Sequence, residues 1–188
     1  MNPNENEPKS DENILLKRIE NKDWNAIFVS GECFRLASAL HKKYGYPIRG
    51  IKSSPEEDNW PHVWVLKDEK KNLALDIRGE FPECVIKFMS LFDKHNEGKI
   101  QYENFLNIVK EIDDKEATCI PIDKIIEKIK KNDKYRGYSE KTIEKINSIT
   151  EKLISNHEMF SFVDLNSNKY KYTYNCFSKA LKTDITDD

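Results

Sequence analysis

The sequence predicts an α+β fold in which a central helix packs against a small antiparallel sheet. One observation is that residues 33–44 have helical character, with Arg35 as the only charge between Cys33 and Leu40. A helix that is apolar nearly all round is typical of the middle of a domain. The other observation is that three short β-branched segments follow within residues 47–78, separated by turn-forming residues. They indicate an antiparallel meander packed on the central helix.

The elements before the meander follow from composition and spacing. Residues 1–12 hold acids and prolines and almost no apolar side chain, which is typical of a disordered tail. Apolar residues at helical spacing predict one helix over residues 13–28. The central helix should end at Gly45, because a Gly followed closely by a Pro is a common helix exit. We therefore expect residues 13–80 to form the core that carries the site.

The second half of the chain is strongly charged and helical in pattern from Phe81 onward. Four amphipathic helices are predicted there, and their charges are interpreted as solvated helix faces. Alternating tyrosines around a turn-forming segment near the end of the chain predict a β-hairpin. Residues 81–188 are thus expected to be a helical extension and a C-terminal hairpin packed on the core. The last predicted helix has an expected buried stripe of Ile143, Ile146, Ile149 and Leu153.

The composition limits the classes of function. The 188 residues carry a formal net charge of −2, so no basic surface predicts a nucleic-acid partner. No apolar run approaches the ~20 residues that span a bilayer, and the acidic N-terminal residues do not resemble a secretory signal, so no membrane partner is expected. The four cysteines lack a CxxC pair, which favours reduced thiols in a cytoplasmic protein, with secretion as an effector left open. The sequence predicts no oligomeric state.

Three residues of the core have types, order and spacing that fit nucleophilic catalysis. Cys33 is expected in the first turn of the central helix, where unpaired N–H groups and the helix dipole favour a thiolate. His62 opens one predicted strand, and Asp76 ends the next strand, 14 residues later. If these strands pair, His62 and Asp76 lie opposite each other, with Cβ atoms about 4.5–5.5 Å apart. The carboxylate would then orient the imidazole so that its other nitrogen faces the thiol.

These residues allow a catalytic and a structural interpretation. In the catalytic one, the imidazole takes the thiol proton, the thiolate attacks a carbonyl carbon, and the imidazolium protonates the leaving group. In the structural one, Cys33 is a small core residue and His62 is a satisfied strand residue. Asp76 would then cap its strand or form an exposed ion pair with a base such as Arg78. The presence of all three residue types together favours catalysis.

Two groups of motifs within residues 30–80 resemble a known superfamily. The first is a Gly-x-Cys motif, a small-residue helix and a following Gly, Pro and Arg, supplied by Gly31, Cys33, Ala37, Gly45, Pro47 and Arg49. The second is a His-x-Trp strand followed by a strand-ending Asp, supplied by His62, Trp64 and Asp76. Together they resemble the transglutaminase-like superfamily of papain-like cysteine enzymes. The resemblance implies a central nucleophile helix against an antiparallel sheet, with Cys33, His62 and Asp76 as the triad.

The resemblance has two departures. The gap of 29 residues between Cys33 and His62 is shorter than is usual for the superfamily, which implies a trimmed substrate-covering loop. The usual Asp-Pro after the second strand is replaced by Asp76-Ile77-Arg78, so no subfamily is indicated. Members of the superfamily include transglutaminases, proteases, peptide N-glycanases, deamidases, arylamine N-acetyltransferases and some inactive binding proteins.

The function expected from the residues and the resemblance is cysteine-dependent acyl transfer at an amide of a protein or peptide substrate. Hydrolysis by a protease or deamidase is favoured over cross-linking, because water is always available and nothing in the sequence marks a site for an amine. The alternative is a non-catalytic interaction protein that retains the fold and uses its helical C-terminal half as a docking surface. No cofactor is expected.

Four aromatic or amide residues are candidates for substrate binding or for the oxyanion hole. Trp24 and Asn25 lie shortly before Cys33, where papain-like sites often place a side chain that completes the oxyanion hole. Trp60 directly precedes the Pro61-His62 pair and could wall the groove, and Trp64 belongs to the strand that His62 opens. The alternative roles are a core Trp, a helix-capping Asn and simple strand packing.

No metal ion is expected. Residues 93–104 resemble an EF-hand loop, but Asn104 stands where a Ca²⁺ site places a bidentate Glu. His41 and His157 have no partners at the spacing of zinc ligands.

Overall fold

The computed structural model describes residues 10–29, 31–86, 104, 107 and 115–156. The helices are α1 (Asp11–Glu20), α2 (Trp24–Val29), α3 (Cys33–Tyr44), α4 (Glu83–Ile86), α7 (Ile122–Tyr135) and α8 (Glu140–Ser155). The strands are β1 (Ile48–Gly50), β2 (Val63–Asp68), β3 (Leu73–Asp76), β4 (Gly79–Pro82) and β5 (Thr118–Cys119). They form one antiparallel sheet in the order β4-β3-β2-β1-β5. The predicted α+β class is confirmed.

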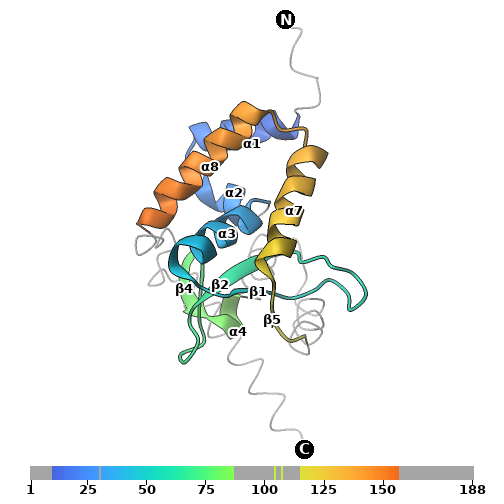
Figure 1. Ribbon diagram of the computed structural model, residues 1–188, viewed down its shortest axis with the longest axis vertical. Helices are drawn as coiled ribbons and strands as arrows, with labels where there is room; N and C mark the ends of the chain where they lie inside the picture. The colour runs from blue at the N-terminus through green and yellow to red at the C-terminus, as the bar shows by residue number, and fades with distance from the viewer. Residues whose placement is uncertain (1–9, 30, 87–103, 105–106, 108–114, 157–188) are drawn as a thin grey trace, which may run out of the picture.

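Helix α3 lies in the middle of this arrangement. One side of it packs on β1, β2 and β3, and other parts of its surface contact α2, α7 and α8 (Figure 1). Its apolar residues belong to a core cluster that also contains Phe28 and Leu75, both fully buried. The helix ends at Gly45, which adopts φ 75°, and the Gly45 N–H donates to the His41 carbonyl at 2.8 Å. This is the left-handed exit that a glycine tolerates, as predicted.

The predicted single helix over residues 13–28 is wrong. The structure has two helices, α1 and α2, separated at residues 21–23. Lys22 adopts φ 53°, and the Asp23 N–H donates to the Arg18 carbonyl at 2.9 Å, which ends α1. The Asp23 Oδ1 accepts from the Ala26 N–H at 3.3 Å at the start of α2. The short polar side chains of Asn21 and Asp23 favour such a break because they bond readily to nearby backbone groups.

The strand register also differs from the prediction. Val65 lies opposite Leu75, so the next residue of β3, Asp76, falls opposite Trp64 and not opposite His62. The connection spans residues 69–72, with Asn72 at φ 48°, and the ladder shifts between Leu66 and Asp68. The left-handed residue and the bulge displace the centre of the hairpin, and a sequence pattern does not reveal such a shift.

Two of the predicted C-terminal helices are present as α7 and α8, and both contact α3 (Figure 1). The buried stripe of α8 is rotated from the predicted one, because Ile143, Ile149 and Leu153 are only partly buried. The helices predicted between residues 87 and 114 and the C-terminal hairpin lie outside the described residues. Among the helices that the structure describes, none is long and apolar enough to cross a membrane. The fully buried face of α8 comprises Thr142, Ile146, Thr150 and Ile154.

A buried charge network joins α3 to α7 and α8. Arg35 Nε donates to Glu32 Oε2 at 2.8 Å, and Nη1 donates to Asn147 Oδ1 at 2.6 Å. Arg35 Nη2 also donates to Asp133, and Arg136 donates to the other oxygen of Glu32 at 3.3 Å. The Arg35 and Glu32 side chains are 7% and 6% exposed. A buried charge is tolerated only with such partners, so the network fixes how α7 and α8 sit on α3.

Replacing Arg35 by Met should lower the free energy of unfolding by about 3–5 kcal/mol, because it leaves the buried Glu32 carboxylate short of a counter-charge. Chemical denaturation measures the change. The matched control is Lys131→Met, which removes an exposed pair with Glu127 on α7 and should change the stability little. Equal, small effects of the two substitutions would contradict a structural role for the network.

Candidate active site

Cys33 is the first residue of α3 and is almost completely buried, with 3% exposure. The preceding Glu32 makes no side-chain cap on the helix, because its carboxylate binds Arg35 and Arg136 instead. The N–H groups of a first helical turn have no intrahelical acceptor, and the positive end of the helix dipole lies there. Cys33 therefore stands where backbone N–H groups can donate to an oxyanion.

His62 and Asp76 meet at the same end of the sheet as predicted, in spite of the shifted register. His62 directly precedes β2, Asp76 ends β3, and His62 Nε2 lies 2.9 Å from Asp76 Oδ2. The histidine side chain is 13% exposed and the aspartate 2%. The Trp64 ring lies beside the imidazole, with its centroid 6.1 Å away. The diagonal offset of two strand positions is still within reach of these side chains.

Arg78 is the residue that the sequence interpretation did not place in the site. Asp76 and Gly79 pair across the β3–β4 turn, so Ile77 and Arg78 form its two-residue connection. The Arg78 N–H donates to Asp76 Oδ1 at 2.8 Å, and Arg78 Nη2 donates to Oδ2 at 2.6 Å. The same Nη2 lies 3.3 Å from His62 Nε2. Asp76 thus binds both bases, and its pair with Arg78 is buried at 2% exposure, not exposed as the structural alternative assumed.

A signal for Arg78 was present in the sequence. An Asp at the end of a strand often begins a turn in which its side chain accepts a hydrogen bond from the backbone N–H two residues on. Such a turn brings the residue at that position against the carboxylate. The sheet was predicted without β4, so this turn was not recognised.

The electrostatics of the site hold a proton on the imidazole. Burial by itself would lower the pKa of His62, but the hydrogen bond with Asp76 and the nearby Cys33 side chain raise that pKa to about 9. The other ring nitrogen, Nδ1, is buried without a hydrogen-bond partner among the described residues. Burial would raise the pKa of Asp76, yet the charge of Arg78 and the hydrogen bond with His62 keep that pKa well below its usual range. Asp76 is therefore an anion at neutral pH.

The surroundings of Cys33 are closed. Phe28, Leu36, Val63 and Leu75 line the space beside the cysteine, which leaves no room for a water molecule. Access to the sulfur therefore requires local opening of these side chains.

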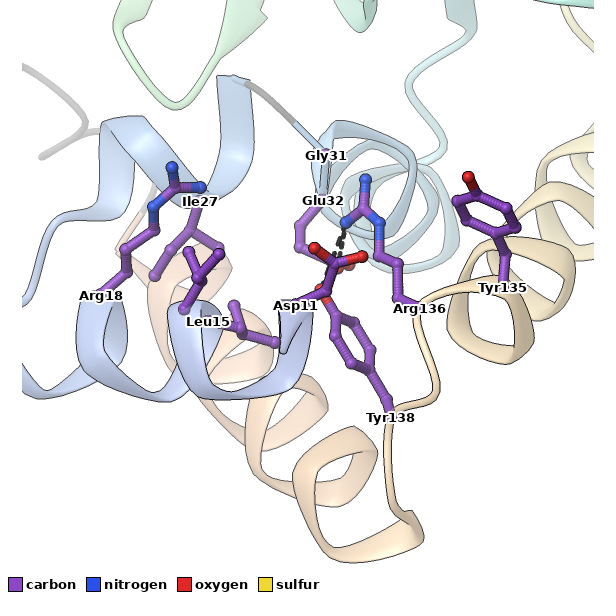
Figure 2. Close-up of a pocket in the computed structure, with 10 residues that line it drawn as sticks. Asp11, Leu15, Arg18, Ile27, Gly31, Glu32, Tyr135, Arg136 and Tyr138 are labelled. Carbon is purple, nitrogen blue, oxygen red and sulfur yellow. Dashed lines mark hydrogen bonds and ion pairs between the residues drawn. The ribbon is translucent and has the colours of Figure 1, made fainter. Parts of the chain in front are cut away.

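A larger cavity of about 330 Å³ lies next to the residues that precede Cys33 (Figure 2). Gly31 and Glu32 contribute to its wall, and the close-up shows Asp11 and Arg136 from other segments beside Glu32. The Arg136 guanidinium lies against Gly31, since a Cβ there would come within 2.5 Å of Arg136 Nη1 and would displace that side chain. The cavity places open space near the N-terminal end of α3.

The four candidate substrate residues have different positions. Trp24 is half-buried against the main core, and Asn25 is exposed on α2. Trp60 is buried at 4% exposure, and the Trp64 indole N–H donates to Glu83 Oε1 at 3.0 Å. Within the described part of the chain, the structure gives no hydrogen bond that joins Trp24, Asn25 or Trp60 to Cys33 or His62. Only Trp64 is thus brought to the histidine, and its N–H is already used.

Of the two histidines considered as zinc ligands, His41 lies within the described residues and His157 outside them. Among the residues that the structure describes, no cluster of three His, Cys, Asp or Glu side chains could hold a metal ion. His41 Nδ1 lies 2.7 Å from the Tyr46 carbonyl oxygen, which accounts for its ring. The segment that resembles an EF-hand loop and His157 lie outside the described residues, apart from the backbone of Asn104.

Comparison of the chain with family models, with curated proteins and with solved structures gives no match. The chemistry of the site therefore has to be argued from its own residues.

Replacing Asp76 by Asn should affect stability and cysteine reactivity together. The change removes the charge that compensates the buried Arg78, which should cost about 3–5 kcal/mol of unfolding free energy. It also favours the wrong imidazole tautomer, so alkylation of Cys33 by iodoacetamide at about pH 6, where an ordinary thiol is almost wholly protonated, should slow sharply. Peptide-resolved mass spectrometry follows Cys33 against the exposed Cys119.

The matched control for Asp76 is Asp68→Asn at the end of β2, where Asp68 accepts from the Lys71 N–H at 3.1 Å on the surface. This variant should keep both the melting temperature and the Cys33 alkylation rate. An Asp76→Asn variant that behaves like the control would remove Asp76 from the site.

Proposed function

We propose that the protein is a cysteine-dependent acyl-transfer enzyme that hydrolyses an amide bond of a protein or peptide substrate. The observation that carries the proposal is the hydrogen bond of 2.9 Å between His62 and the buried Asp76, at a place where Cys33 begins α3 and lines the same closed space as Asp76. An imidazole held between a carboxylate and a thiol is the arrangement that activates a cysteine nucleophile.

The reaction proceeds in two halves. In the resting site the imidazole of His62 already holds the proton, and the Cys33 thiolate attacks the carbonyl carbon, so that a C–S bond forms and the carbonyl electron pair moves to oxygen. N–H groups of the first turn of α3 stabilise this oxyanion. The C–N bond then breaks, the leaving amine takes the proton from His62, and a thioester remains on Cys33.

The second half releases the product. Water gives a proton to His62 and attacks the thioester carbon, and the C–S bond breaks as the carboxylic acid forms. Cys33 leaves as the thiolate beside the protonated His62, which restores the starting state. Asp76 keeps the ring orientation and stabilises the imidazolium in both halves, and it stays ionised throughout.

The arrangement of the core supports a relation to the papain-like enzymes. A buried helix with the cysteine at its first residue packs on an antiparallel sheet, and that sheet supplies the histidine and the aspartate from neighbouring strands. The resemblance of residues 30–80 to the transglutaminase-like superfamily implies this order of elements. Hydrolysis is favoured over amine transfer because no described feature of the site selects an amine over water.

A second candidate function is a non-catalytic interaction protein with the same fold. The observation that favours it is the closed surroundings of Cys33, which is only 3% exposed. A binding protein does not require an accessible sulfur, so reactivity of Cys33 separates the two functions.

Incubation with p-nitrophenyl acetate, a small activated acyl donor, tests the proposed chemistry. The Cys33 thiolate should displace nitrophenolate and carry the acetyl group as a thioester, which acid quenching and mass spectrometry detect. Cys33→Ser should abolish the labelled peptide, and His62→Ala should slow its formation by about 100-fold or more. Cys119→Ser, which removes the exposed thiol, is the control that should leave the reaction of Cys33 unchanged. Faster acetylation of Cys119 than of Cys33 would favour the interaction protein.

A further inference from the structure

The Asp76 carboxylate is shared between two bases, and this changes the charge balance of the site. Both of its oxygens accept bonds from Arg78, and Oδ2 also lies 2.9 Å from His62 Nε2. Arg78 and Asp76 are each 2% exposed, so water screens neither charge effectively. Arginine stays protonated at any pH of interest. Asp76 and Arg78 therefore form a buried pair with no net charge.

We infer that Arg78 is a positioning residue that sets the pH at which Cys33 becomes reactive, by cancelling the charge of Asp76 beside His62. The inference rests on the proposed function, because it concerns the pairing of the same cysteine and histidine. It goes beyond that function in assigning a role to a residue outside the triad.

The net charge of the site, summed over Asp76, Arg78, His62 and Cys33, depends on which of these groups are protonated. When Cys33 is a thiol and His62 is protonated, the cluster of Asp76, Arg78, His62 and Cys33 carries one positive charge. Loss of the thiol proton makes the cluster neutral, which is the favourable direction in a buried site. Without Arg78, the same step would lead from a neutral cluster to a negative one. Arg78 therefore favours the thiolate at lower pH.

Arg78 also makes the imidazolium depend on the thiolate. With Asp76 already neutralised, the positive charge of His62 has the Cys33 thiolate as its remaining counter-charge. In a triad without the arginine, the aspartate alone would hold the proton on the histidine. Removal of the thiol should therefore lower the pKa of His62 when Arg78 is present. When Arg78 is absent, the pKa of His62 should stay high.

The other charged groups near the site are paired among themselves. On α3, Glu32 and Arg35 bind each other and the network with α7 and α8. On the sheet, Arg49 donates to Glu83 at 2.8 Å, and Lys67 donates to Glu80. In the described part of the chain, Asp76 and Arg78 contact the His62 ring at 2.9 and 3.3 Å, and Cys33 is the further titratable side chain that acts on it.

The first experiment measures the pH dependence of Cys33 alkylation in the wild type and in Arg78→Met. In Arg78→Met, the midpoint of the acid limb of the rate profile should move to higher pH by about one unit or more. The plateau at high pH should be retained, since the thiolate itself is unchanged. The control is Arg49→Met, which removes an arginine of β1 that is bound to Glu83 at the start of α4 and should leave the limb in place. If Arg78→Met does not fold, Arg78→Gln, which keeps amide donors toward Asp76, takes its place with the same expected shift.

The second experiment follows the His62 ring by NMR and does not depend on alkylation. In Cys33→Ser, which is close to isosteric, the ring should lose its proton at a markedly lower pH than in the wild type. Adding Arg78→Met to Cys33→Ser should raise the midpoint again, because Asp76 is then free to stabilise the imidazolium. A merely structural role of Arg78 would move the melting temperature without moving either midpoint.

The outcomes separate the inference from the proposed function. If His62→Ala slows Cys33 alkylation in the wild-type background but Arg78→Met leaves the acid limb unchanged, the triad stands and the role of Arg78 is overturned. If Cys33→Ser leaves the His62 midpoint unchanged, the dependence on the thiolate is overturned as well. If Cys33 shows no dependence on His62, both the proposed function and the inference fail.

Discussion

The structure of this protein depends on the neutralisation of one buried carboxylate. Asp76 is 2% exposed at the end of β3, where an isolated charge would be very costly. Arg78 offsets that cost, because its N–H and its guanidinium both donate to the Asp76 carboxylate across the two-residue turn. Strand β4 begins directly after this turn. The hairpin and the site thus depend on the same ion pair. His62 is oriented by a carboxylate whose position the turn has already fixed.

Helix α3 links the site to the rest of the fold. Cys33 is the first residue of the helix. Glu32, directly before it, and Arg35, two residues after it, form the buried network that binds α7 and α8. The same short segment therefore positions Cys33 and anchors the helical extension. A displacement of α7 or α8 would act on the start of α3 through Arg35. The C-terminal helices are in this sense part of the support of the site.

The sequence predicted the central helix, the antiparallel meander and the meeting of His62 with Asp76. These predictions succeeded because each depends on a local pattern, such as the uncharged helix, the Gly45 exit or the alternation of the strands. The meeting of His62 and Asp76 survived a register error, since the shift kept both residues at the same end of the sheet. A pattern of period two fixes the face of a strand but not the length of its turn.

The parts that the sequence missed depend on contacts between distant segments. The charges of α7 were interpreted as a solvated face, yet Asp133 binds Arg35 at a separation of 98 residues. Arg78 was considered only as an exposed partner, because its burial follows from β4 and from the packing around the turn. Burial of a charge is decided by tertiary partners, which no local window contains.

The most direct test of the account is the ultraviolet absorbance of the Cys33 thiolate, measured as the difference between the wild type and Cys33→Ser over a pH series. We expect the thiolate signal of Cys33 to be present already at about pH 6, where an ordinary thiol is protonated. The substitution His62→Ala should remove that signal at the same pH. A signal that appears only near the ordinary thiol value of about 8.5, with or without His62, would contradict an activated cysteine at this site.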